Sequence, residues 1–135
     1  MITSRLMFCS HGAVRDAETN TISVFSIWEE LQAATFPLFV QRFFVVAFLA
    51  REEGDGAQSR LTLNISLGDQ LLNTFPIAVD FGDKLKNRLI TEVNGLPIPG
   101  PGTLRFEVLE NERLINAWDI GVAAAAAPQL RLQPA

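Results

Sequence analysis

Regular alternation of apolar and polar residues is the feature that most constrains what this chain can fold into. Between Arg60 and Leu67 every second residue is leucine or isoleucine, and the residues between them are polar. The segment 104–108 repeats this pattern. Because successive side chains of a strand point to opposite faces, a period of two is typical of strands with one buried and one wet face. The chain is therefore predicted to be built from β-strands.

Turn-forming residues separate these segments at short intervals. The expected strands cover residues 5–11, 21–27, 38–50, 58–67, 71–79, 86–94, 103–109 and 113–122, and only Trp28–Ala34 could make a helical turn. Many short strands with turns between them predict an all-β fold, a two-sheet antiparallel β-sandwich of immunoglobulin-like type with about eight strands. We expect a single domain over residues 1–122, followed by a poorly ordered tail that contains alanine and proline, residues 123–135.

The segment Phe36–Ala50 departs from the alternation because it is apolar on both faces. A strand of this kind is either central and covered twice or lies at a subunit contact. The loop Trp28–Ala34 or the C-terminal tail could supply the second cover, and self-association is the alternative. Apolar residues make up 48% of the chain and the mean hydropathy is +0.21, which is high for a small monomer. These values are compatible with an apolar surface that another subunit covers.

Six apolar residues are interface candidates on this basis. Three belong to the apolar strand, and the other three are expected to gather with Phe36 at one end of the sandwich: Phe39, Phe43, Phe44, Trp28, Leu96 and Ile98. A hydrophobic cap over the open end is the alternative for the second group. The segment Asn94–Gly102 holds three of the seven prolines, and because proline has no N–H for a ladder we expect an exposed, semi-rigid loop there.

Acidic residues concentrate in alternate loops of the predicted sandwich. If the strands run simply up and down, the first, third, fifth and seventh loops share one end, which would hold Asp16, Glu18, Glu52, Glu53, Asp55, Asp80, Asp83, Glu110 and Glu112. Carboxylate oxygens are ligands that Ca²⁺ prefers, so the first seven are candidates for a calcium site. The alternatives are solvated loops, since basic residues flank the same segments, and a basic partner.

Few residues of the chain are suited to catalysis. It contains one histidine, His11, one cysteine, Cys9, and no tyrosine. Two positions apart on a strand, Cys9 and His11 stand roughly 6.6–6.8 Å apart at their Cα atoms, and parallel side chains do not readily meet end to end. We interpret Cys9 as a structural residue and assign no catalytic residues. The sequence lacks a phosphate-binding glycine loop and a dinucleotide fingerprint, so we predict no cofactor.

Charge and hydropathy limit the kinds of partner that the chain can bind and the cellular compartment in which it is expected. The net charge of −4 and the scattered basic residues argue against nucleic acid. The apolar run Phe36–Ala50 is too short to cross a bilayer, and the N-terminus lacks the layout of a signal peptide. A lone cysteine makes no internal disulfide. We therefore expect a cytoplasmic protein that contacts neither membrane nor nucleic acid.

Three segments resemble a family of small bacterial proteins that carry a domain of unknown function. They are Met7–Asp16 (MFCSHGAVRD), Thr21–Trp28 (TISVFSIW) and the Phe36-Pro37 pair ahead of the apolar strand. The closing segment Gly102–Asn111 is similar to the last hairpin of that group. Ser26 stands where the family pattern has glycine. The resemblance covers residues 5 to 120, implies a β-sandwich and carries no functional residue over.

These observations favour a non-catalytic interaction or assembly module. We expect it to self-associate through the strand Phe39–Leu49 or through a sheet edge. The expected partner is a second copy of the chain, in a homo-oligomer, or another protein. The alternative is a domain that binds a small ligand or Ca²⁺ at the acidic end. An enzyme is the third possibility.

Overall fold

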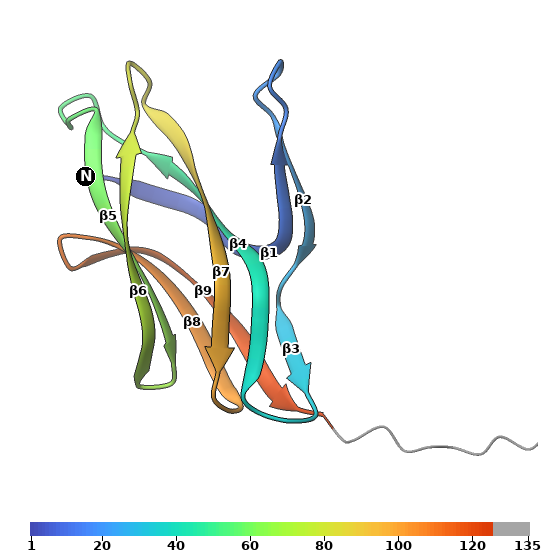
Figure 1. Cartoon of the computed structure of the whole chain (residues 1–135). Coiled ribbons are helices and arrows are strands. Elements are labelled where there is room, and N and C mark those ends of the chain that lie inside the picture. The colour runs from blue at the N-terminus through green and yellow to red at the C-terminus, as the bar shows by residue number, and fades with distance from the viewer. Residues whose placement is uncertain (126–135) are drawn as a thin grey trace, which may run out of the picture.

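A computed structural model describes residues 1–125 as nine strands in two sheets. The strands are β1 (Thr3–Arg15), β2 (Ile22–Ile27), β3 (Glu30–Ala33), β4 (Leu38–Ala50), β5 (Gln58–Leu67), β6 (Gln70–Asp80), β7 (Lys86–Ile98), β8 (Gly102–Glu110) and β9 (Arg113–Ala124). The four-stranded sheet has the order β2-β1-β4-β7, and the five-stranded sheet the order β3-β9-β8-β5-β6 (Figure 1). The predicted all-β, two-sheet fold is confirmed.

Two segments differ from the sequence-based expectation. Trp28–Ala34 forms no helical turn: its residues Glu30–Ala33 are β3, which pairs in parallel with β9, opposite Gly121–Ala124. The first half of the expected proline loop is strand, because β7 continues to Ile98 and pairs with β4 as far as Leu38. The expected tail also begins later, since β9 reaches Ala124; the rest of the tail prediction lies outside the described residues.

The core lies between the two sheets and is built from the alternating residues. Leu61, Leu63 and Ile65 of β5 are buried, and so are the apolar residues of β8. The four-stranded sheet contributes Met7, Cys9, Phe43, Val45, Ala47 and Leu49, together with Leu89, Val93, Leu96 and Ile98 of β7. The Phe43 ring lies 5.7 Å from Phe106 and 4.9 Å from Trp28, measured between ring centroids.

β1 pairs with two different strands along its length. It pairs with β4 up to Ser10 and with β2 from Ser10 onward. The second half of β1 and β2 therefore form a hairpin that stands apart from the rest of the molecule in Figure 1. β4 is central in its sheet, and its outward Val46 is also buried, so one chain covers most of the doubly apolar strand.

The backbone at Ser26 explains the glycine of the family pattern. Ser26 has φ of 54°, in the left-handed region where a Cβ is unfavourable. We expect Ser26→Gly to raise the free energy of unfolding by about 0.5–1 kcal/mol, measured by urea denaturation. Ser23→Gly, in the same strand but at ordinary φ, is the control and should lower it by about 0.5–1 kcal/mol. Equal losses in both variants would contradict the assignment of strain to Ser26.

Candidate functional site

Three of the six interface candidates are core residues. Phe43, Leu96 and Ile98 are each no more than 1% exposed, so the prediction that they form a contact surface is wrong for the folded chain. Leu96 and Ile98 are buried because β7 extends through the expected loop and directs alternate side chains inward.

The other three candidates keep part of their surface. Trp28 packs on Phe43, and its carbonyl accepts a 2.8 Å hydrogen bond from the indole N–H of Trp118. The half-buried Phe44 ring lies under the guanidinium of Arg42, at 5.2 Å. Phe39 is 61% exposed and is the one candidate that presents most of its side chain to solvent. It lines a groove of about 480 Å³ with Trp28 and His11.

The acidic loops stabilise their own turns. The Asp16 carboxylate accepts hydrogen bonds from the amides of Thr19 and Glu18, which lower its pKa. Asp55 accepts 2.7 Å and 2.9 Å hydrogen bonds from the N-terminal ammonium and from the Glu52 amide, and both lower its pKa.

The acidic loops do not all lie at the same height in the molecule. The turns after β1, β4 and β6 lie at the upper end in Figure 1, while the β8–β9 turn lies lower.

Residues 1–125 contain no group of three acidic, cysteine or histidine side chains placed to hold a metal ion. The calcium candidates Asp16, Glu18, Glu52, Glu53, Asp55, Asp80 and Asp83 are therefore not assembled into a site. Glu110 pairs instead with Arg113 at 2.8 Å and accepts a bond from Ser59. Burial acts to raise the pKa of Glu110, but these contacts outweigh it and the pKa lies below its usual value.

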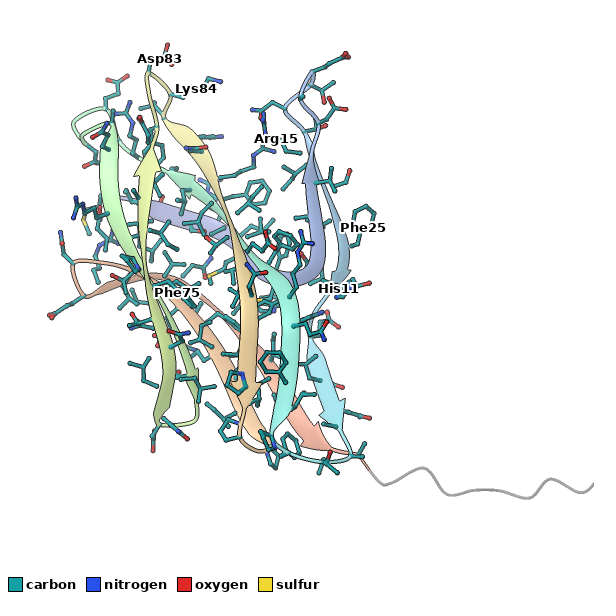
Figure 2. The ribbon with its side chains drawn as sticks, viewed as in Figure 1. His11, Arg15, Phe25, Phe75, Asp83 and Lys84 are labelled. Atoms are coloured by element: carbon teal, nitrogen blue, oxygen red, sulfur yellow. The ribbon has the colours of Figure 1, made fainter. Side chains whose placement is uncertain are left out.

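Cys9 and His11 occupy different environments. Cys9 is fully buried in the core, and burial raises the pKa of its thiol well above the ordinary value. His11 (Figure 2) is exposed and lines the same groove as Phe39. No hydrogen bond of the described residues joins the two side chains.

Because the thiolate is the reactive form, Cys9 should be inert in the native protein. We expect its reaction with a disulfide reagent at neutral pH to be slower than in the urea-unfolded chain by roughly 100-fold or more. Absorbance of the released thiolate measures both rates. Equal rates in native and unfolded protein would show that Cys9 is accessible.

The sheet edge formed by β2 differs from the other three edges. β6 contains Pro76, β7 contains Pro97 and charged residues, and β3 is four residues long. These are the usual devices that prevent strand pairing between molecules. Residues 21–28, which include all of β2, hold no charge and no proline.

Side chains of the β1–β2 hairpin make this edge apolar. Phe25 is 55% exposed and projects from β2 (Figure 2). Val14 and Ile27 are exposed as well. The Phe25 ring lies over Gly12, where an added Cβ would meet it at 3.3 Å. Phe25 is thus held in place while its outer surface stays open. The sequence showed β2 as a strand but gave no sign that it is an edge.

The hydrogen bonds of the hairpin determine which groups face outward. The Asp16 amide donates to the Thr21 carbonyl at 2.8 Å, and bonded and non-bonded pairs alternate in an antiparallel ladder. The pair Ala13–Val24 is therefore non-bonded, and the N–H of Val24 points to the free edge. In the described part of the chain no strand pairs with β2 on that side.

Fold and surface together define a small two-sheet all-β domain that offers an unprotected strand edge. The described residues form no helix that is long and apolar enough to span a membrane. The chain belongs to a family of unknown function, DUF6941, whose family model matches residues 5–123. A comparison with curated proteins finds no match.

Proposed function

We propose that this domain is a non-catalytic interaction module of the cytoplasm that self-associates through the edge of β2. The observation that carries the proposal is the absence of charge and of proline from segment 21–28, beside the exposed Phe25. An unprotected apolar edge pairs readily with another strand. Two copies of β2, antiparallel about a twofold axis, would join two four-stranded sheets into one continuous sheet.

A second copy of the chain is the partner that this edge fits best. The edge is uncharged, whereas an edge that captures a charged peptide would need complementary charges beside it. A twofold axis places the same apolar residues opposite one another, so Phe25 and Ile27 of both copies would cover each other's exposed surface. The central strand β4 is paired on both sides and mostly buried, so it offers no free edge for such pairing.

Sedimentation velocity over a hundredfold concentration range tests this proposal. We expect a dimer that dissociates on dilution, and Val24→Pro should weaken dimerisation at least about tenfold, because it removes the outward N–H and leaves the β1–β2 bonds in place. Phe25→Lys should weaken it similarly through charge at the contact. Leu71→Lys is the matched control, since Leu71 is 56% exposed on the other sheet.

Circular dichroism and thermal unfolding verify that each variant is folded. A monomer at every concentration would reject self-association. A dimer that Val24→Pro and Phe25→Lys leave intact would reject β2 as the contact.

A further inference from the structure

A broad cleft of about 1010 Å³ separates the β1–β2 hairpin from β4, β7 and the β6–β7 turn. Arg15 lies on the hairpin side and Lys84 on the facing turn, with Lys86 and Arg88 along β7 (Figure 2). We refer to this feature as the hairpin cleft. It lies on another side of the hairpin from the free edge of β2, and it plays no part in the proposed self-association.

The charge of the hairpin cleft is opposite to that of the whole chain. Four cationic side chains line it, with two carboxylates, those of Asp80 and Asp83, whereas the chain carries a net charge of −4. Among residues 1–125 none of the four cations lies within ion-pair distance of a carboxylate. Arg15 and Lys84, two of the basic residues that flank the acidic loops in the sequence, thus lie in this cleft.

Two arginines converge on a single neutral residue that lines the cleft. Arg15 Nη1 donates to Asn20 Oδ1 at 3.2 Å, and Arg88 Nη2 donates to the same oxygen at 2.9 Å. Arg88 also donates to the backbone carbonyl of Asn20. An amide oxygen positions the two guanidinium groups but does not neutralise them, so two like charges are held close together. A bound anion would offset this repulsion and take up the remaining donors.

Apolar side chains form part of the same cleft. Phe48 and Ile90 both line it, and Ile90 remains 36% exposed. Inorganic anions gain nothing from such surface, whereas an organic anion can bury its apolar body there.

From the paired arginines and this apolar lining we infer that the hairpin cleft binds a small organic anion, with its acid group between Arg15 and Arg88 and its aromatic or aliphatic body against Phe48 and Ile90. Arg15 and Arg88 are then binding residues, and Asn20 is the residue that positions them. The ligand class is an amphipathic carboxylate, sulfonate or phosphate.

Fluorescence titration with anilinonaphthalene sulfonate tests the inference, with the uncharged phenylnaphthylamine as the matched probe. We expect saturable binding of the sulfonate that weakens roughly tenfold or more in the double variant Arg15→Gln/Arg88→Gln. Salt should weaken it as well. Arg60→Gln, an exposed arginine of β5 outside the cleft, removes the same charge and should leave binding unchanged.

Two further variants keep the test decisive. If the double arginine variant does not fold, Lys84→Gln/Lys86→Gln replaces it, since both lysines are exposed, and a loss of roughly threefold or more is expected. Phe25→Lys should leave sulfonate binding unchanged, which separates the cleft from the β2 edge. The inference is overturned if the sulfonate does not bind, if cleft variants leave its affinity unchanged, or if the uncharged probe shows the same dependence on them.

Discussion

Replacing Phe43 with alanine is expected to lower the free energy of unfolding by about 3–5 kcal/mol. Phe43 is fully buried at the centre of the core, between the Trp28 ring of the β2–β3 connection and Phe106 of the five-stranded sheet. Truncation would remove both aromatic contacts and leave a cavity, because neighbours on two hydrogen-bonded sheets can move little to fill it. Urea denaturation followed by tryptophan fluorescence measures the change.

Phe39→Ala is the control for this prediction, since it is the same substitution four residues earlier in β4. The Phe39 side chain is 61% exposed, and its ring touches the Gly95 position of β7. We expect a loss of about 0.5–1 kcal/mol. Similar losses in the two variants would mean that Phe43 is not a central residue of the core.

The second large effect is expected at Arg51, which holds two loops together. Its Nε donates to the Lys84 carbonyl at 2.9 Å, Nη1 to the Asp55 carbonyl at 2.8 Å and Nη2 to the Gly82 carbonyl at 3.3 Å. The guanidinium also lies 5.7 Å from the centre of the buried Phe81 ring. Removing the side chain leaves the loop carbonyls without their charged donor, so Arg51→Ala should cost about 2–3 kcal/mol.

Arg51→Lys separates charge from geometry. A lysine keeps the charge but lacks the planar fork that reaches three carbonyls at once, so we expect it to recover no more than about half of the loss. Arg60→Ala, at an exposed position, should change stability by less than about 0.5 kcal/mol. Amide hydrogen exchange would show faster opening of residues 51–57 and 81–85 in Arg51→Ala, and unchanged exchange there would contradict this assignment.

Local pattern was a reliable guide wherever one face of a strand is buried. The leucines of β5 and the apolar residues of β8 point inward, as their alternation predicts, because a shift of one residue would expose all of them. The glycine expected at position 26 coincides with a left-handed backbone, so the resemblance carried conformational information too. The segment Leu96–Ile98 was misread because proline was taken to end the strand, whereas Pro97 lies in β7, an edge strand that tolerates it.

What the sequence could not supply was the order of strands in each sheet. β3 is only four residues long, and the residues with which it pairs lie about ninety positions later in the chain, so no local signal predicts it. The exposed edge of β2 and the cationic hairpin cleft could not be predicted for the same reason, because both result from the order of the strands. Arg15 and Arg88 are far apart in sequence, and Asn20 brings them together only because β1 leaves β4 at Ser10.

The pairing of β3 with β9 has a consequence for how the chain folds during its synthesis. Glu30 lies opposite Gly121, so β3 has no strand to pair with until about ninety further residues have been synthesised. Until then the Trp118 side chain that bonds to the Trp28 carbonyl has not been made either. Contacts of such long range also close slowly. Folding of this domain is therefore completed only once β9 has been synthesised, and β3 stays without a strand partner until then.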